Sequence, residues 1–512
     1  MHRPSSTEAE VADELAAVRP ALADRFAAER PGARAAVLSR LWRAFAHEPL
    51  PWIAGREPAG DGLVLRLGDG RRLTGPAADP YRTDAYAPVV HLDEVAYDDP
   101  ERLMTDLAVA HSAGFAAELG HSVGSLALSR AGQPRAVGGA APDNHPDNHP
   151  DEWPETDWGW ERRVVDGHPY HPGCRSRPGF SVAEQLAYGP EHGPVVELGL
   201  VPVPAAECLV TGSWPRELRD GPAVLVPVHP WQAAHVLKRP CEEGIAAHPL
   251  MSLRTLAVPG GPHVKTALSA RLTSSVRDIS VASVGASADV SHFGQELAAR
   301  LDGLLHVTGT LGAVAAGSPD LAAVLRESPR EYAGPGEHVV PVAALAGTGL
   351  SGSPGWQAAF ARLALGVGLR LLELGVALEA HGQNLLVLLS PTGEPLRLVY
   401  RDLADIRVSP ARLARHAIAV PPLPARMLTD DPVALRRKLF GSLVGGALAA
   451  TAGSGAVLGK ALEEAVRELP RTPDVLALSD EPLPVKSLTL MRTSPGTSGD
   501  LWTELPNPLH AG

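Results

Sequence analysis

The chain has 512 residues, 45% apolar and 20% charged, which is typical of a soluble globular protein large enough for two or three domains. Its 46 basic and 58 acidic side chains give a formal net charge of −12, which argues against a general nucleic-acid role, because that role needs a broad basic surface. Three cysteines without a CxxC spacing predict neither a disulfide framework nor a thiolate zinc site and favour a cytoplasmic protein.

The first 135 residues are predicted to be mainly helical. Apolar residues recur at three- and four-residue intervals in VADELAAVRPALADRF and AAVLSRLWRAFA. Alternation around Gly-Asp-Gly in LVLRLGDGRRLTG predicts a β-hairpin. The polar segment APDNHPDNHPDEWPETDWGW predicts an exposed linker or insertion, so we expect an N-terminal domain over residues 1–150. His145 and His149 of this segment could bind a metal, although a solvated loop is the simpler interpretation.

Residues 167–181, GHPYHPGCRSRPGFS, hold two His-Pro pairs and two arginines. The glycines and prolines exclude a regular helix, so these side chains are expected on a loop of fixed shape. Imidazoles and guanidiniums held in this way can serve a metal or an anion, or can be purely structural.

The central part, residues 151–335, is predicted to be rich in strands, with PVVELGLVPV and PAVLVPVHPWQ as the clearest examples. The Gly/Pro-rich region 333–355 predicts a boundary to a C-terminal domain over residues 336–512. Because helices and short strands follow without a regular β-α-β alternation, the pattern favours an α+β fold.

An anion site is predicted in HVKTALSARLTSSVRDIS, residues 263–280. As a strand, this segment directs Lys265 to one face, and residues 273–275 then suit the N-cap of a helix that contains Arg277. Hydroxyls at a helix start beside Lys and Arg bind anions well, and the SLRT segment at 252–255 adds another such set. The alternative is a half-buried strand flanked by surface charges.

A magnesium site is predicted further along. A long amphipathic helix, WQAAFARLALGVGLRLLELGVALEA, is expected to end near Glu379, and LLVLL and LRLVY are predicted strands joined by the turn residues PTGE. Folding this hairpin about Gly393 would bring Asn384 opposite Asp402. Amide and carboxylate oxygens suit magnesium, and Glu379 and His381 precede the same strand. The alternative is a hairpin that merely has polar ends.

One uncharged stretch, LFGSLVGGALAATAGSGAVLG at residues 439–459, has the length of a membrane span. It is rich in Gly, Ala, Ser and Thr, however, and AGSG predicts a break between two buried helices. We therefore expect no membrane association.

Together these segments supply Lys, Arg and His for several anionic oxygens and a carboxylate–amide set for magnesium, as nucleotide triphosphate chemistry on an anionic substrate requires. The motifs GxxxxGK(S/T) and HExxH do not occur, which excludes P-loop and zincin sites.

The order of these motifs resembles a known family. The chain carries HPYHPGCRSRPGF, VPVHPWQ, SLRT, KTALSARLTSSVR, EAHGQN and YRD in that order, followed by PVKSLTLMRT and WTELPNPL. Over residues 161–509 it resembles the siderophore synthetases that work independently of non-ribosomal peptide synthetases, the aerobactin-synthetase (IucA/IucC) type.

The resemblance implies a three-region architecture like a cupped hand around a central ATP and substrate cleft. It also implies Mg²⁺- and ATP-dependent adenylation of a carboxylate, most often citrate or a citrate-derived half-amide. An amine or hydroxyl then attacks the acyl-adenylate and gives an amide or ester, AMP and pyrophosphate. Members of the family are often homodimers.

The resemblance also implies roles for individual residues. It assigns His168, Arg175, Ser252, Arg254 and Thr255 to ATP phosphates, with Gln383 nearby; Lys265, Thr273, Arg277 and His381 to the reacting α-phosphate and carboxylate; Glu379, Asn384 and Asp402 to magnesium; and Lys486 to the carboxylate substrate. Arg175 departs from the family's loop, which usually has Lys there. An arginine preserves phosphate contact but not a role in proton transfer.

Two other functions compete with this one. A kinase-like phosphotransferase would use the Asn384 and Asp402 pair and release ADP, although no glycine-rich phosphate loop precedes it. A non-enzymatic metal- or siderophore-binding protein would use the DNHPDNHP tract and bind metal without ATP, which leaves Lys265, Arg254 and Arg277 unexplained.

Overall fold

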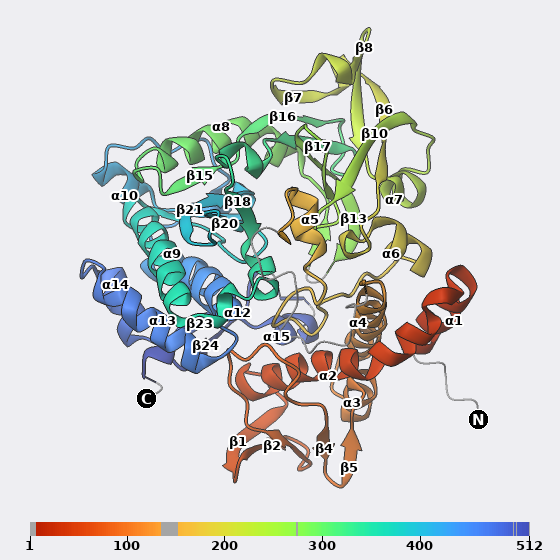
Figure 1. Ribbon diagram of the computed structural model, residues 1–512, viewed down its shortest axis with the longest axis vertical. Coiled ribbons are helices and arrows are strands. Elements are labelled where there is room, and N and C mark those ends of the chain that lie inside the picture. The colour runs from red at the N-terminus through yellow and green to blue at the C-terminus, as the bar shows by residue number, and fades with distance from the viewer. Residues whose placement is uncertain (1–6, 135–151, 273–274, 495, 498, 511–512) are drawn as a thin grey trace.

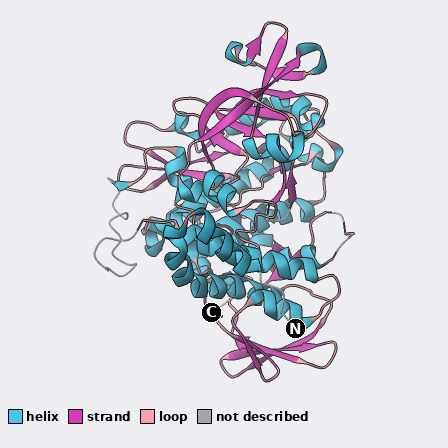
Figure 2. Ribbon diagram, turned by 90° about the vertical axis from the view of Figure 1, so that its right-hand side faces the viewer, coloured by secondary structure: helices cyan, strands magenta, loops and turns pink. Residues whose placement is uncertain are grey.

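The computed structural model describes residues 7–134, 152–272, 275–494, 496–497 and 499–510 and mixes helices with largely antiparallel sheets (Figure 1). The predicted α+β class is thereby confirmed. The DNHPDNHP tract lies outside the described residues, as does Thr273. A view turned by 90° shows strands gathered towards both ends of the long axis, with most helices between them (Figure 2).

The N-terminal region combines helices with a five-stranded antiparallel sheet. Its elements are α1 Thr7–Val18, α2 Ala23–His47, α3 Pro100–Leu107, α4 Ala113–Ala131, β1 Ile53–Ala59, β2 Gly62–Leu67, β3 Arg72–Pro76, β4 Val90–Leu92 and β5 Val95–Tyr97, and the sheet order is β1-β2-β3-β4-β5. β2 and β3 are the hairpin predicted around Gly-Asp-Gly. The predicted helical periodicity buries one face of α1 and α2 in a core that includes Leu15, Phe26 and Trp42.

A nine-stranded antiparallel sheet forms the upper part of Figure 1. Its strands are β6 Val196–Pro204, β7 Leu209–Gly212, β8 Arg219–Asp220, β9 Ala223–Val228, β10 Glu242–Pro249, β11 Thr255–Ala257, β12 His263–Thr266, β16 Thr310–Ala315 and β17 Ala322–Arg326, in the order β7-β16-β17-β12-β11-β10-β6-β9-β8. The two predicted strands PVVELGLVPV and PAVLVPVHPWQ are β6 and β9, which pair with each other. The helices α5 Asp157–Arg162, α6 Val182–Tyr188 and α7 Pro230–Gln232 accompany this part.

The predicted helix that would contain Arg277 is wrong. A hairpin of β13 Leu268–Leu272 and β14 Ser275–Arg277 occupies this place, with Leu268 opposite Arg277. The following helix, α8 Val281–Ala298, begins later because Ser280 caps it by accepting a hydrogen bond from the Ser283 N–H. The β-branched and hydroxyl residues of this segment favour a strand pair over a helix start.

The C-terminal region is built on a four-stranded sheet in the order β15-β21-β20-β18. Its elements are β15 Leu305–Val307, β18 His338–Pro341, α9 Pro354–Leu374, β19 Val376–Ala377, β20 Leu385–Leu389, β21 Pro395–Tyr400, β22 Arg407–Val408, α10 Pro410–Arg415, α11 Pro432–Ser442, the π-helix η14 Leu443–Leu448, α12 Ala449–Ala452, α13 Gly455–Arg467, α14 Pro473–Asp480, β23 Leu483–Lys486, α15 Leu488–Thr493 and β24 Trp502–Leu505. The predicted helix ends at Leu374 rather than near Glu379, because Gly375 adopts φ 113° and closes it.

The predicted register of the C-terminal hairpin is one residue off. β20 and β21 form the expected pair, but Leu385 lies opposite Tyr400, and the Arg401 N–H donates to the Asn384 carbonyl oxygen at 3.0 Å. Asn384 therefore lies opposite Arg401, and Asp402 follows with φ 74°. The register shift next to Leu389 makes the turn asymmetric, which a fold about Gly393 does not anticipate.

The domain boundaries after residues 150 and 335 remain predictions. The first falls within 135–151, outside the described residues. The central and C-terminal parts are in contact, for example where β15 runs parallel to β21 of the C-terminal sheet and where Trp160 of α5 shares a hydrophobic cluster with the C-terminal helices.

The uncharged stretch at 439–459 lies in the interior. Within the described residues, no single helix is long and apolar enough to cross a membrane; one pair of helical segments, 432–452 and 455–467, passes by length and composition, and it is bent by 119°. The predicted break is confirmed, because Gly453 ends α12 with φ 74° and Ser454 caps α13. Leu439, Val444 and Leu458 of this stretch belong to the largest hydrophobic cluster.

The N-terminal region also contacts the C-terminal tail. Glu48, 2% exposed just after α2, accepts hydrogen bonds from the backbone N–H groups of Thr489 at 3.0 Å and Leu490 at 2.7 Å. These groups begin α15, so a carboxylate there satisfies helix donors that have no partner within the helix. Arg492 of α15 also pairs with Glu118 of α4.

We expect Glu48→Ala to lower the free energy of unfolding by about 1–3 kcal/mol, because two buried N–H groups lose their acceptor. Urea denaturation measures this at pH 8, above the pKa of Glu48, which burial raises to about 7. Glu94→Ala is the matched control, because Glu94 is exposed. Equal stability of the two variants would contradict the contact's role.

Candidate functional site

A central cavity of about 970 Å³ lies where the three regions meet. Among the described residues, twelve Lys or Arg and six Asp or Glu side chains line it, an excess of positive charge inside an acidic chain. Thirteen of the fourteen predicted site residues line this cavity: His168, Arg175, Ser252, Arg254, Thr255, Lys265, Arg277, Glu379, His381, Gln383, Asn384, Asp402 and Lys486. Residues more than 300 positions apart in the sequence therefore share one space; the fourteenth, Thr273, lies outside the described residues.

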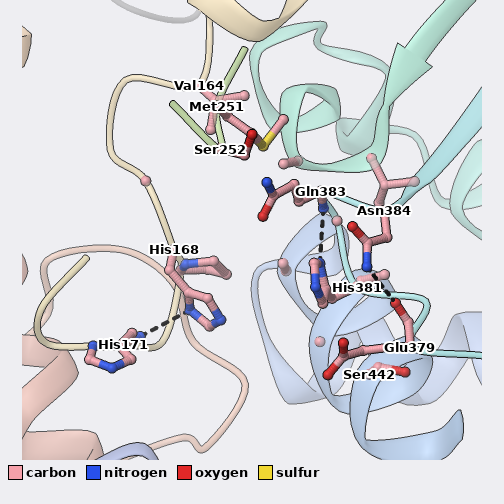
Figure 3. A pocket seen from close by; sticks show the side chains of 18 of the residues that line it. Val164, His168, His171, Met251, Ser252, Glu379, His381, Gln383, Asn384 and Ser442 are labelled. Carbon is pink, nitrogen blue, oxygen red and sulfur yellow. Dashed lines mark hydrogen bonds between the residues drawn. The ribbon is translucent and has the colours of Figure 1, made fainter. Parts of the chain in front are cut away.

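The His-Pro loop presents His168 to the cavity in a fixed tautomer (Figure 3). The Nδ1 atom of His168 accepts hydrogen bonds from the N–H groups of Tyr170 and His171, both at 3.1 Å. Nε2 must then carry the proton and is a hydrogen-bond donor. Enclosure by protein lowers the pKa of His168 well below 6.5, so the ring is neutral at pH 7.

The same local bond recurs at the other motif histidines. His171, His229 and His381 each accept from the N–H two residues ahead, at 2.8, 3.1 and 3.2 Å. At the His-Pro pairs, proline has no N–H and a fixed φ, so the first free donor is the one that bonds. His171 and His229 are 2% and 0% exposed, which agrees with structural roles, whereas His381 lines the cavity beside Glu379.

Arg40 of α2 holds the His-Pro loop from behind. Its Nε donates to the carbonyl oxygens of His168 at 3.1 Å and Pro169 at 3.0 Å, and its Nη2 lies 3.4 Å from the Asp166 carbonyl oxygen. Arg40 is 6% exposed and also bonds the Ala36 carbonyl of its own helix, so its geometry is fixed. Sequence reasoning missed this residue, because nothing in the helical pattern of α2 distinguishes it.

Arg175 directs its guanidinium to the protein rather than to the cavity. Its Nε donates to the Val165 carbonyl at 2.7 Å, and its Nη2 donates to the Val164 carbonyl. Arg175 is 6% exposed and lies 3.6 Å from the Glu191 carboxylate. Its predicted contact with a phosphate remains a prediction, and it would require these bonds to rearrange.

The SLRT segment forms a tight turn on the cavity wall. Ser252 accepts a hydrogen bond from the Thr255 N–H at 3.2 Å, and Leu253 between them has φ 63°. Arg254 donates to the carbonyl oxygens of Arg277 and Asp278, each at 2.8 Å, and so ties this turn to the end of β14. Burial lowers the pKa of Arg254 to about 10, which still leaves it cationic at pH 7.

Asp402 bridges two cations that the nine-stranded sheet supplies. Its Oδ2 lies 2.5 Å from Lys265 Nζ of β12, and its Oδ1 lies 3.0 Å from Arg326 Nη2 of β17. Burial alone would raise the pKa of Asp402, but Arg326 and Lys265 hold it well below its usual 3.8. Arg326 was not predicted from the sequence; it ends an apolar strand next to β12, so only the strand pairing reveals it.

Glu379 forms a second cluster of this kind in the cavity lining. Its Oε1 accepts from Lys438 Nζ at 3.1 Å and from Lys486 Nζ at 3.0 Å. Lys438 also bonds Asp405 at 2.5 Å, and Lys486 bonds Asp500 at 3.1 Å. Lys438 was missed, although the chain has only five lysines and three of them, Lys265, Lys438 and Lys486, line this cavity.

Glu379 and Asn384 each have an oxygen atom that can bind a magnesium ion, provided that oxygens of a bound substrate complete its coordination. Within the residues that the structure describes, no group of three or more His, Cys, Asp or Glu side chains is arranged to hold a metal. Both lysines bond Oε1 of Glu379, which leaves Oε2 for another partner, and Asn384 donates through Nδ2 to the Glu379 carbonyl at 3.4 Å, which leaves its Oδ1 (Figure 3). Magnesium is usually held by one or two carboxylates together with substrate oxygens, so these residues fit it in that form.

Glu161 connects two segments that line the cavity. It is 1% exposed; its Oε2 accepts from the Met251 N–H at 2.8 Å, and its Oε1 pairs with Arg401 at 2.5 Å. Arg401 also donates to the Gln383 carbonyl at 3.0 Å. One carboxylate from α5 thereby fixes the SLRT turn relative to the EAHGQN turn.

Comparison with known proteins agrees with the motifs. Residues 158–347 match the model of the IucA / IucC family, and residues 355–500 match a model described as ferric iron reductase FhuF-like transporter. The predicted resemblance to the aerobactin-synthetase type is thereby confirmed.

Two curated relatives illustrate the sequence similarity. The chain is 25% identical over 312 residues to the citryl-spermidine/3,4-dihydroxybenzoyl-citryl-spermidine:spermidine ligase of Bacillus anthracis, covering 48% of this chain and 50% of that protein. It is 28% identical over 159 residues to the N(2)-citryl-N(6)-acetyl-N(6)-hydroxylysine synthase of Vibrio mimicus, covering 24% and 26%. The chain thus spans half the length, or less, of these two relatives.

Solved structures share the whole fold. The petrobactin biosynthesis protein AsbB from Bacillus anthracis str. Sterne matches with a TM-score of 0.72 and 17% identity, covering 96% of this chain and 98% of that one. The ATP-bound aerobactin synthetase IucA from a hypervirulent pathotype of Klebsiella pneumoniae matches with a TM-score of 0.71 and 18% identity, covering 93% and 99%. At these identities the likeness establishes the fold.

We expect the protein to lose stability as the pH falls from 7 to 5. Burial lowers the pKa of His47, His121, His171 and His192 to about 4 and that of His229 to about 3. The unfolded chain binds protons at these sites near pH 6.5 and the folded chain does not, so each histidine destabilises the fold by roughly 1–2 kcal/mol at pH 5. Glu48, whose pKa burial raises to about 7, acts in the opposite direction.

Thermal unfolding at pH 7.5, 6 and 5 measures this effect. His171→Gln should flatten the dependence, whereas His292→Gln should not, because His292 is exposed. A melting temperature that is constant or rises towards pH 5 would contradict the burial argument.

We expect Arg40→Met to loosen the His-Pro loop locally. Three carbonyl groups of residues 166–169 lose their donor, so amide hydrogen exchange over residues 165–176 should accelerate by tenfold or more while that of α9 stays unchanged. Arg415→Met is the matched control, because Arg415 is exposed on α10. Uniform acceleration throughout the chain would show a general loss of stability and would contradict a local role.

Proposed function

We propose that this chain, whose residues 158–347 match the IucA / IucC family, is an ATP-dependent siderophore synthetase. It would activate a carboxylate, citrate or a citrate-derived half-amide, as an acyl-adenylate and condense it with an amine or hydroxyl. AMP and pyrophosphate would be released, and the enzyme would be a carboxylate–amine ligase or its ester-forming equivalent.

The observation that carries this proposal is the positive charge of the central cavity. A chain with a formal net charge of −12 gathers twelve Lys or Arg side chains around one space with six acidic ones. A triphosphate and a polycarboxylate repel each other, so bringing them together needs such an excess of cations in a site shielded from water. The cavity also has the volume that a nucleotide and a small acid require together.

The phosphates would bind against the His-Pro loop and the SLRT turn. His168 supplies a neutral Nε2–H donor there, because its Nδ1 is occupied by two backbone N–H groups. The hydroxyls of Ser252 and Thr255 and the cationic Arg254 line the same wall. A neutral N–H donor has the advantage that it binds a phosphate oxygen equally well on either side of pH 6.5.

In the first step, a carboxylate oxygen would attack the α-phosphorus. One O–P bond forms, and the bond from the α-phosphorus to the bridging oxygen breaks, so that pyrophosphate leaves with that electron pair. Lys265 and Arg277 would offset the repulsion between the two anions, with Thr273 and Lys486 as further partners. Holding the reactants in line makes the step effectively unimolecular, which can contribute on the order of 7–11 kcal/mol.

In the second step, the nucleophile would attack the acyl carbon and AMP would leave. A C–N or C–O bond forms, the acyl C–O bond to AMP breaks, and the nucleophile's proton passes to solvent or to the departing phosphate. His381 keeps its proton on Nε2 because Nδ1 accepts from the Gln383 N–H at 3.2 Å. It would therefore donate a hydrogen bond to the oxygen that gains charge, rather than act as a base.

Glu379, Asn384 and Asp402 would hold magnesium together with the nucleotide. Asp402 would first have to release Lys265 or Arg326, which occupy its two oxygens. When bound there, the ion would neutralise phosphate charge as a Lewis acid. The oxygens that the lysines leave open on Glu379, and the Oδ1 of Asn384, support this assignment.

The printed names of the relatives support a citrate-derived substrate. Both the Bacillus anthracis ligase and the Vibrio mimicus synthase are named for citryl amides. Their nucleophiles differ, one being spermidine and the other a hydroxylysine derivative. The proposal therefore specifies the class of carboxylate substrate and does not specify the amine.

The test is pyrophosphate release with Mg-ATP and a panel of carboxylates, with hydroxylamine as a surrogate nucleophile. We expect citrate- or half-amide-dependent pyrophosphate and hydroxamate, reduced at least about 100-fold in Arg277→Ala. Arg239→Ala is the matched control, because Arg239 is exposed and does not line the cavity.

Two outcomes would overturn the proposal. Release of ADP with a phosphorylated product would favour the phosphotransferase alternative. Tight metal or siderophore binding without any nucleotide turnover, with every carboxylate tested, would favour a binding protein.

A further inference from the structure

One helical segment contributes three glycines to the cavity lining. Gly441 lies in the last turn of α11, and Gly445 and Gly446 lie in the π-helix η14. π-Helical turns are uncommon and are found mostly at functional sites. All three glycines border the cavity beside the Glu379 cluster, where Figure 3 shows Glu379, Ser442 and His381 together.

Packing explains two of these glycines. A Cβ at Gly441 would lie 2.7 Å from a ring carbon of Trp502 and 3.0 Å from the Pro484 carbonyl oxygen. A Cβ at Gly445 would lie 2.5 Å from Val485 Cγ1. At both positions β23 and β24 approach the helix so closely that only glycine fits.

Packing does not explain Gly446. A Cβ there would have ordinary contacts, 3.4 Å from the Gly441 carbonyl oxygen and 3.9 Å from His381 Cβ, and, outside its own helical turn, no third atom of the described chain lies within 4 Å. Gly446 is partly exposed, whereas Gly445 is buried. Glycine is less favourable than alanine inside a helix. Gly446 therefore lowers the stability of the helix, although no packing contact requires a glycine there.

We propose that Gly446 determines substrate specificity by leaving the cavity open beside His381. The space would admit the non-reacting part of the carboxylate substrate, the branched bulk of a tricarboxylic acid such as citrate. This inference rests on the proposed function, in which His381 and Lys486 face the carboxylate. Lys438 and Lys486, which meet at Glu379 on the same side, would attract the remaining carboxylates of such an acid.

The geometry also separates this position from the phosphate end. The His-Pro loop and the SLRT turn that would bind the triphosphate come from residues 167–181 and 252–255, whereas a Cβ at Gly446 would approach only Gly441 and His381 outside its own helical turn. A side chain at 446 should therefore hinder the acid and spare the nucleotide.

The experiment titrates citrate, and separately Mg-ATP, calorimetrically into the wild-type protein, Gly446→Ala and Gly446→Leu. We expect citrate affinity to fall two- to fivefold in Gly446→Ala and at least tenfold in Gly446→Leu. Affinity for ATP should stay within twofold in both. Unchanged citrate affinity in Gly446→Leu, equal losses for citrate and ATP, or a wild-type protein that binds no citrate would each overturn the inference.

Thermal unfolding supplies the structural control. Gly446→Ala should melt at the wild-type temperature or above, whereas Gly445→Ala should melt several degrees lower, because its Cβ meets Val485. If Gly446→Ala is destabilised as much as Gly445→Ala, then position 446 is packed and the inference fails. A wild-type protein that binds citrate and ATP but releases no pyrophosphate would overturn the proposed function while leaving the size argument intact.

Discussion

The ion pairs of the half-buried Asp402 carboxylate with Lys265 and Arg326 are the interactions on which the site depends. Asp402 lies at the end of β21 in the four-stranded sheet, and its two cations, Lys265 and Arg326, come from neighbouring strands of the nine-stranded sheet. Removing a single member would leave a buried charge without its partner, whereas an apolar set of similar volume could pack there at no loss of stability. Stability alone therefore does not account for these charged side chains between the two sheets. They are explained if the cations are needed for an anion that enters the cavity.

The Asp402 and Glu379 clusters are built in the same way. Asp402 and Glu379 are each bonded by two cationic side chains, so the cations keep a defined position before any ligand arrives. Preorganised charges need no reorientation when negative charge develops in the reaction, which is the main source of electrostatic stabilisation in active sites. The histidines add donors without adding charge, since His168 and His381 accept at Nδ1 and carry the proton on Nε2. The cavity is thus rich in donors, and its positive charge comes from Lys and Arg alone.

Features that depend only on short contiguous segments were predicted correctly from the sequence. The motif residues converge on one cavity, and β6, β9, β20 and β21 form where their apolar runs predict them. Sequence reasoning failed where a neighbour in space decides: Ser280 rather than the residues at 273–275 caps α8, and an asymmetric turn moves Asn384 opposite Arg401. Arg40, Glu161 and Lys438 carry no local signature, because their partners lie more than 30 positions away in the sequence. Long-range ion pairs of this kind require the fold before they can be recognised.

The N-terminal region, which contains none of the motifs, acquires a physical role from these contacts. The His-Pro loop bonds its two imidazoles with its own N–H groups, but a loop of glycines and prolines has few further N–H groups to offer its carbonyls. Arg40 of α2 and Ser122 of α4 supply the missing partners, donating to the carbonyls of His168, Pro169 and Pro172. Glu48 and Glu118 then bind the first and last turns of α15, which follows directly on the strand of Lys486. The same helices therefore position both the His-Pro loop and the tail at the cavity, although this part of the chain contains none of the motifs.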